Sequence, residues 1–165
     1  MFSLLFMLVQ QVTFSLPKVS GYSMMPTITD GDRLVVNKLG TIKRFSLVYY
    51  RDPNSKETSI RRVVGLPNER LTYRSDQLYI NDQEVVERFL EEAKEQAKAN
   101  ETQITEDFTL SEVLQTDVIS EETYFVLGDN RSYASDSRDF GTIKRRDIIG
   151  TVEMRWLPFH RLTRF

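Results

Sequence analysis

A serine in a tight turn near the start of the chain is the first candidate for chemistry. Ser23 lies within Gly21-Tyr22-Ser23-Met24-Met25-Pro26-Thr27, and Gly31-Asp32 follows. A serine on a short turn between glycine and proline can present its hydroxyl group and its backbone N–H together. A nucleophile with a main-chain oxyanion donor requires that arrangement. Turn serines also commonly hydrogen-bond only to their own backbone, so Ser23 alone leaves a structural role open.

Two further segments carry polar residues in unusual density. Ile60-Arg61-Arg62-Val63-Val64-Gly65-Leu66-Pro67 places two arginines in a β-branched run. Gly128-Asp129-Asn130-Arg131 and Ser135-Asp136-Ser137-Arg138 follow a predicted strand and are bounded by Gly141. Aspartate and arginine this close together predict a loop held by internal hydrogen bonds. Taken alone, the loop is equally well explained as a structural turn with paired charges.

The composition excludes several other kinds of site. The 165 residues contain no cysteine and a single histidine, His160, close to the C-terminus. A disulfide framework, a cysteine nucleophile and a histidine-rich or Cys-ligated metal site are therefore excluded, and no metal or cofactor is predicted. We interpret His160 as a partly exposed strand or tail residue. Twenty-two Lys and Arg against 24 Asp and Glu argue against nucleic acid as a partner, because phosphate binding needs a basic surface.

Short β-strands must position these segments. From Lys18 onward the chain is rich in β-branched and aromatic runs, and Val86 to Ala99 is the one stretch that reads as helical. Its apolar stripe is thin, which predicts a solvated insertion that we extend over the acidic residues to about 122. A hairpin is predicted over residues 71–80, followed by a turn at Asn81-Asp82. The other predicted strands cover residues 33–37, 46–50, 59–64, 123–127 and 148–156.

The first residues differ from the rest of the chain. Met1 to Leu16 carries no charge, and Gln10-Gln11 interrupts its apolar run. A membrane-spanning helix needs about 20 mostly apolar residues, and a secretory signal peptide needs a basic start and a cleavage site with small residues. We interpret residues 1–17 as the remnant of a membrane anchor that precedes a β-rich domain over 18–165. An amphipathic or buried first helix is the alternative.

Together the three polar segments resemble the type I signal peptidases, membrane-anchored serine endopeptidases that use a Ser-Lys dyad. The motifs Ser-Met-x-Pro-Thr, Arg-Val-Val-Gly-Leu-Pro and Gly-Asp-Asn-Arg…Asp-Ser-Arg occur in the family's order between Val19 and Phe165. The resemblance implies a mainly β fold, an antiparallel β domain of signal peptidase I type with a small helical insertion. It also implies a single-pass anchor in the cell membrane, an extracytoplasmic domain, and membrane lipid and signal-peptide-bearing precursors as partners.

The resemblance assigns roles to individual positions. Ser23 would be the nucleophile, with its own N–H as the oxyanion donor. Asp136 and Arg138 would form the ion pair that shapes the site. The loop that the family uses to build the site corresponds here to Asp129, Asn130, Arg131, Asp136 and Arg138.

Two departures from the family pattern affect the chemistry. Arg61 occupies the position of the lysine that acts as the family's general base. Arginine stays protonated in proteins and cannot accept the serine proton. Ala134 occupies the position of the serine that hydrogen-bonds that lysine. We therefore expect Ser23, Arg61 and Ala134 to converge, with weak hydrolytic activity or none.

Three hypotheses follow. The first is a degenerate signal peptidase homologue that is an accessory in secretion or in pilus assembly, because it resembles the signal-peptidase-like proteins of Gram-positive pilus clusters; its precursors would then include pilins. The second is an active signal peptidase I that removes signal peptides, with Lys38 or Lys144 as the first replacement base to test. The third is a self-cleaving repressor related to LexA, which shares a Ser-Met turn and Gly-Asp. Such repressors need a DNA-binding helix-turn-helix where this chain has Met1 to Leu16.

Overall fold

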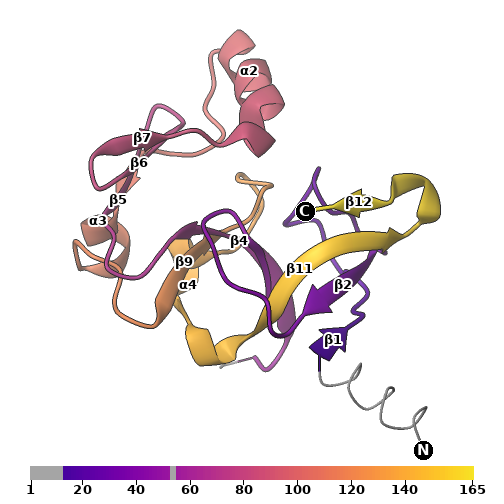
Figure 1. Ribbon diagram of the computed structural model, residues 1–165. Coiled ribbons are helices and arrows are strands. Elements are labelled where there is room, and N and C mark those ends of the chain that lie inside the picture. The colour runs from indigo at the N-terminus through magenta and orange to yellow at the C-terminus, as the bar shows by residue number, and fades with distance from the viewer. Residues whose placement is uncertain (1–12, 53–54) are drawn as a thin grey trace, which may run out of the picture.

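Two antiparallel sheets form the molecule (Figure 1). The computed structural model describes residues 13–52 and 55–165. The larger sheet contains β1 (Phe14–Ser15), β2 (Arg33–Asn37), β3 (Leu47–Arg51), β4 (Thr58–Gly65), β9 (Thr123–Leu127), β10 (Ile143–Lys144), β11 (Ile148–Leu157) and β12 (Thr163–Arg164). Its order is β1-β2-β11-β3-β4-β9-β10, with β12 paired to β11. The expected mainly β, antiparallel fold is confirmed.

The smaller sheet is built from two tight hairpins. Its strands are β5 (Leu71–Arg74), β6 (Gln77–Ile80), β7 (Gln83–Val85) and β8 (Phe108–Thr109), in the order β7-β6-β5-β8. The two-residue connections Ser75-Asp76 and Asn81-Asp82 both have positive φ. Such turns match the right-handed twist of the flanking strands. The predicted hairpin over 71–80 and the turn after it are confirmed.

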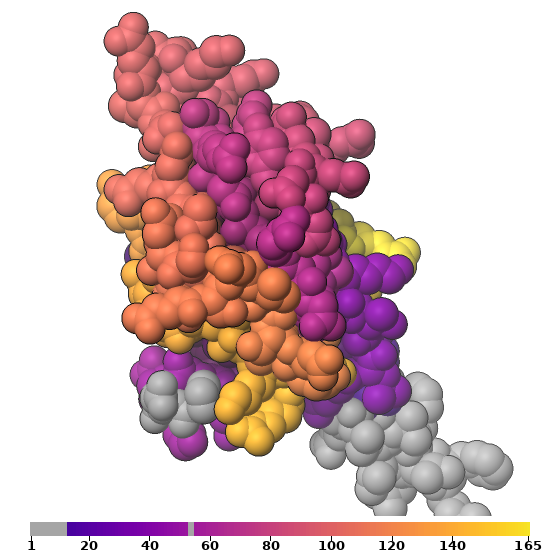
Figure 2. Space-filling view, turned by 90° about the vertical axis from the view of Figure 1, so that its left-hand side faces the viewer, coloured from indigo at the N-terminus to yellow at the C-terminus, as the bar shows by residue number. Residues whose placement is uncertain are grey.

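One apolar core joins the two sheets. Tyr73 and Leu78 of the smaller sheet pack with Val64, Phe125 and Leu127 of the larger one, and all five are buried. Figure 2 shows the side of the molecule that is covered by the smaller sheet and by the segment that follows it. Strands β4 and β9 are therefore enclosed, which fixes the polar segments at their ends.

The predicted insertion is solvated in its first part only. After the turn η1 (Arg88–Leu90), helix α2 (Glu91–Ala99) projects from the molecule and buries little besides Ala97. The residues that follow are more ordered than their pattern indicated. Strand β8 pairs with β5, and a capping box at Thr109 and Glu112 starts helix α3 (Leu110–Leu114). Phe108, Leu110 and Ile119 lie in the core.

The expectation of a solvated segment to residue 122 is therefore wrong at Phe108, Leu110 and Ile119, whereas residues 111–112 and 115–118 are exposed as expected. Most of the segment's apolar residues fall in elements of only two and five residues, β8 and α3, which are too short to give a periodic signal. The bounds of an insertion at 86–122 stay a prediction. The remaining short helices are α4 (Ser137–Phe140), η2 (Arg145–Asp147) and η3 (Phe159–Arg161).

The predicted anchor lies mostly outside the described residues, since it falls on Met1 to Leu16 and residues 1–12 are not described. Phe14–Ser15 of the same segment forms β1, which pairs antiparallel with β2. Within the described ranges no helix combines the length and the apolar character that crossing a membrane requires. The anchor interpretation of residues 1–17 stays a prediction.

Candidate functional site

The turn that carries Ser23 docks directly against the polar loop after β9. The Asn130 backbone N–H donates to the Ser23 carbonyl oxygen at 3.0 Å, and the Asn130 side-chain amide donates to the Tyr22 carbonyl oxygen at 3.1 Å. Gly21, at the start of the turn, has a φ of +95°, a conformation that glycine adopts without steric cost. The first and third sequence motifs therefore meet through the backbone.

Gly128 lets Ser23 and Ala134 approach each other. A Cβ atom at residue 128 would lie 2.2 Å from the Ala134 Cβ and 2.6 Å from the Ser23 carbonyl oxygen. Neither distance is sterically allowed, so the close contact requires a glycine here. Ala134 itself is buried.

Arg61 reaches the same place from β4. Ser23 and Arg61 line one cavity of about 160 Å³. The Arg61 Nε and Nη2 donate to the Ser135 carbonyl oxygen at 2.9 and 2.6 Å, and Nη1 donates to the Ile60 carbonyl oxygen at 2.7 Å. The structure thus brings Ser23, Arg61 and Ala134 together, as expected. Their catalytic roles stay a prediction.

One buried carboxylate ties the three motifs to each other. Asp129 accepts from Arg62 through both oxygens, at 2.8 Å from Nε and 2.5 Å from Nη2. The Thr27 hydroxyl donates to the same carboxylate at 2.5 Å. Thr27, Arg62 and Asp129 each belong to a different motif. A bidentate guanidinium–carboxylate pair fixes orientation as well as distance. The three segments are therefore held in one fixed position relative to each other.

The ion pair expected in the polar loop is present. Arg138 donates to both oxygens of Asp136 at 2.8 Å, from Nε and Nη2. Asp136 also accepts from the Gly128 N–H at 3.0 Å and caps helix α4. The fully buried Asp136 side chain therefore sets the loop around Gly128, on which Ser23 and Ala134 pack.

Sequence reasoning missed the partner of Arg131. Glu87 is fully buried and accepts from Arg131 Nη2 at 2.5 Å, from the Tyr73 hydroxyl at 2.7 Å and from Lys94 at 3.0 Å. Burial by itself disfavours the charged Glu87, but Arg131 outweighs it, and the pKa of Glu87 lies below its usual value. Burial raises the pKa of Tyr73. No signal in the sequence singles out Glu87, which sits among many exposed acidic residues.

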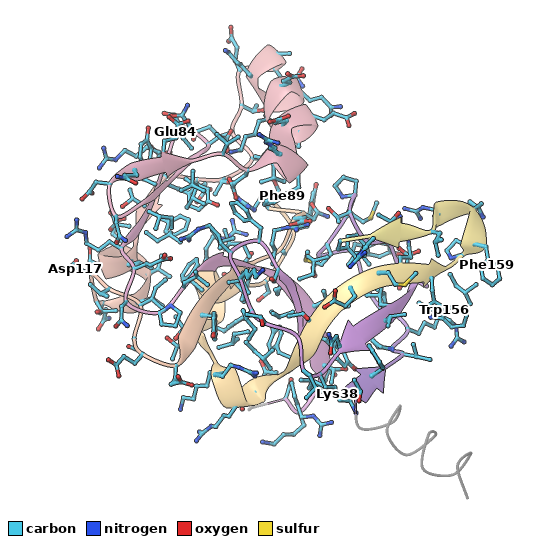
Figure 3. All side chains as sticks on the ribbon, viewed as in Figure 1. Lys38, Glu84, Phe89, Asp117, Trp156 and Phe159 are labelled. Atoms are coloured by element: carbon cyan, nitrogen blue, oxygen red, sulfur yellow. The ribbon has the colours of Figure 1, made fainter. Side chains whose placement is uncertain are left out.

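The lysine that lines the Ser23 cavity is Lys18, not Lys38 or Lys144. All seven lysines lie in the described part of the chain, and Lys18 is the one among this cavity's lining residues. Lys38 lies near β1 at the edge of the larger sheet (Figure 3), and Lys144 is exposed in β10. Lys38 and Lys144, the two lysines first chosen as replacement bases, therefore do not line this cavity, whereas the exposed Lys18 does. His160 is exposed in η3 and does not line the cavity.

Comparisons with known proteins agree on one family. The sequence model of "Signal peptidase, peptidase S26" matches residues 1–157. Signal peptidase I V of Bacillus subtilis is 42% identical over 139 residues, covering 82% of this chain and 81% of that protein. Signal peptidase I of Bacillus caldolyticus is 43% identical over 150 residues, covering 88% of this chain and 81% of that protein.

A solved structure supports the same relationship. The crystal structure of a signal peptidase I from Enterococcus faecalis superposes with a TM-score of 0.64 at 38% identity. It covers 68% of this chain and 97% of the other. The family match extends over all three polar motifs, and the repressor hypothesis gains no support from it.

Proposed function

Because the chain belongs to the signal peptidase, peptidase S26, family, we propose that it binds the signal peptides of secreted precursors. In this proposal it hydrolyses the peptide bond that follows the signal peptide slowly or not at all. The first half of the proposal rests on the family and on the relatives, which are named signal peptidases. The second half rests on one observation, the environment of Arg61.

Arg61 supplies hydrogen-bond donors where the family reaction needs an acceptor. Its guanidinium faces the Ser135 and Ile60 carbonyl oxygens and lines the cavity that contains Ser23. A guanidinium has no free lone pair and stays charged in proteins, so it cannot take the serine proton. Loss of a general base typically lowers the rate by about 10²–10⁴-fold.

Ala134 lacks the hydroxyl group that would orient a lysine base. A lysine base needs a hydrogen-bond partner that holds its amine towards the serine. The Ala134 methyl group packs on Gly128 beside the Ser23 carbonyl and offers no such partner. Both changes therefore act on proton transfer, whereas the turn that carries Ser23 and the Asp136–Arg138 pair are retained.

An active signal peptidase I is the second candidate function, and the names of the relatives favour it over the impaired form. Hydrolysis would then require another base near Ser23. Lys18 is the lysine that lines the cavity, so its amine is the group to test. A lysine acts as a base only when its surroundings lower its pKa towards neutrality.

The same proposal includes a location and a partner surface. The uncharged segment Met1 to Leu16 supports a membrane anchor, with the β domain on the outer face of the cytoplasmic membrane. Membrane lipid and secreted precursors would be its partners. A role in pilus assembly, with pilins as precursors, stays a hypothesis that the genes next to this one would test.

Binding and cleavage of one precursor separate the two candidate functions. The full chain and its Ser23→Ala variant are incubated with a precursor that has small residues at the first and third positions before the cut. We expect both proteins to bind the precursor equally and the wild type to cleave it at the rate of the variant or only slightly above that rate.

Rapid cleavage that Ser23→Ala abolishes would establish the active enzyme instead. In that case Lys18→Ala, with the exposed Lys144→Ala as the matched control, identifies the base. Absence of precursor binding by the wild type would refute engagement of signal peptides altogether.

A further inference from the structure

Arg61 is unusual among the buried arginines of the described residues. Four arginine side chains are buried, and Arg61 is 9% exposed. Three of the four form an ion pair with a buried carboxylate, whereas Arg61 has no ion pair with any residue that the structure describes. The three pairs are Arg62 with Asp129, Arg131 with Glu87, and Arg155 with Asp32.

An unpaired buried cation is costly unless something else compensates its charge. The two carbonyl oxygens that Arg61 contacts satisfy some of its donors but carry no net charge. A guanidinium has five N–H donors, and three are used here: Nε and one on each terminal nitrogen. One N–H on each terminal nitrogen is left over. A carboxylate accepts from such a pair with both oxygens.

The cavity around Arg61 is suited to a negatively charged ligand. Its lining includes the two cations Arg61 and Lys18 and contains no aspartate or glutamate. Ser23 also lines the cavity, and neither its hydroxyl group nor its backbone N–H makes a hydrogen bond with a residue that the structure describes. The cavity therefore presents positive charge and unused donors to a ligand.

We propose that the Ser23–Arg61 cavity binds the C-terminal carboxylate of a cleaved signal peptide. The inference rests on the proposed function, because a signal peptide must first enter the cavity. Hydrolysis by any peptidase leaves a new carboxylate at the end of the signal peptide. That carboxylate occupies the position that the scissile carbonyl would take beside Ser23, and there Arg61 provides the missing counter-charge.

The chemistry distinguishes arginine from the lysine of the family pattern. A lysine that serves as a base must be neutral for part of the cycle. Arginine instead supplies a permanent charge in a planar fork, which matches the geometry of a carboxylate. The replacement thus converts a site for proton transfer into a site that recognises an anionic peptide end.

Two peptides of one sequence test the inference on the full chain. Both carry the last residues of a signal peptide with small residues at the first and third positions from the end. One ends in a free carboxylate and the other in an amide. We expect the wild type to bind the carboxylate form about 10–100-fold more tightly, the usual effect of a charge-assisted hydrogen bond. Isothermal titration or fluorescence anisotropy measures both dissociation constants.

Variants then assign the preference to Arg61. Arg61→Gln should bind both peptides equally, and Arg61→Lys should keep part of the preference because it keeps the charge. Arg70→Gln is the matched control, since Arg70 is exposed, pairs with Asp82 and lies outside the cavity. It should behave as the wild type. Circular dichroism checks that each variant is folded. The comparison of the two peptides on the wild type does not depend on the folding of any variant.

Three results would overturn the inference. Equal binding of the two peptides by the wild type refutes a carboxylate site and leaves precursor binding, measured separately, untouched. A preference that survives in folded Arg61→Gln removes Arg61 from the site. Competition by inorganic phosphate at the same concentration as the peptide would mark a general anion site rather than one for a peptide end.

Discussion

At the scale of single residues, the proposed loss of hydrolysis depends on two side chains, Arg61 and Ala134. Arg61 donates to the Ser135 carbonyl oxygen, and the Ala134 methyl group lies against Gly128, beside the Ser23 carbonyl oxygen. The rest of the local geometry depends on Gly128 and on the Asp136 carboxylate, which the two changes leave in place. Replacement of both residues therefore tests proton transfer at the site without altering the loop that holds Ser23.

The double change Arg61→Lys with Ala134→Ser should restore cleavage of a signal-peptide precursor. Burial at residue 61 would lower the pKa of a lysine, and a serine hydroxyl at residue 134 would orient its amine. Arg61→Lys alone should restore less, because an unanchored lysine keeps a mobile and more solvated ammonium group. We expect the double variant to exceed the wild type by up to about 10²-fold, measured as initial rates on one precursor.

Ser23→Ala in the double variant is the control, and it should return cleavage to background. If the double variant binds precursor but remains inert, the site has lost more than its base and only binding remains.

The motif residues could be placed from sequence because each motif has fixed spacing and the motifs occur in one order. The convergence of Ser23, Arg61 and Ala134 was expected from the resemblance to the signal peptidase family that these motifs carry. Glu87 could not be found in the same way. Its burial depends on Arg131 and Tyr73, which lie 44 and 14 residues away along the chain, and the acidic residues nearest to it in sequence are exposed. The position of Lys18 beside the cavity could not be predicted either, because a single lysine before a turn carries no pattern.

At the scale of elements, the long strands were predicted to within a residue or two at each end, and the short elements were not. Strands β2 to β6, β9 and β11 have the β-branched or alternating runs that half-buried sheets require. Strands β1, β8, β10 and β12 have two residues each, too few to show alternation. They form because a longer neighbour offers its edge, which is a tertiary effect.

The Glu87–Arg131 pair connects the smaller sheet and the start of α2 to the loop after β9. It joins the segment before α2 to the loop after β9, and Tyr73 of β5 completes it. The smaller sheet is thus linked to the site loop by a buried charge pair as well as by the apolar core. The pKa of Glu87 is lowered in the folded chain, so its contribution to stability is complete above the unfolded-state pKa. That contribution is lost as the pH falls through the folded-state pKa.

Glu87→Gln should lower the free energy of unfolding at pH 7 by about 3–5 kcal/mol, because it leaves Arg131 buried without a counter-charge. The variant should also lose less stability than the wild type between pH 7 and the acid range below about pH 4, because the wild type alone must protonate Glu87. Urea denaturation at several pH values measures both effects. Glu95→Gln on the exposed face of α2 is the matched control, and a similar loss in that variant would contradict the role of the pair.

At the scale of the whole molecule, charge is divided between two regions. Residues 82–122 contain 13 of the 24 acidic residues and 3 of the 22 basic ones, so the remainder of the chain is basic. The region with α2 lies at the opposite end of the molecule from β1, where the described chain begins (Figure 1). Phe14 and Leu16, at that beginning, are exposed apolar side chains. An anionic membrane surface near β1 would therefore attract the basic body, and the acidic region would point away from it.

This arrangement predicts that the chain is recovered with membranes through its first residues. The full chain should pellet with the membrane fraction, resist extraction by high salt and be released by detergent, because apolar burial is insensitive to screening while surface charge pairing is not. Deletion of residues 1–16 should move the protein to the supernatant or leave it bound only at low salt. Ser23→Ala, which changes no surface charge, is the control and should fractionate as the wild type. If the full chain stays in the supernatant at low salt, the anchor interpretation of residues 1–17 is wrong, and the exposed Phe14 and Leu16 then need another partner.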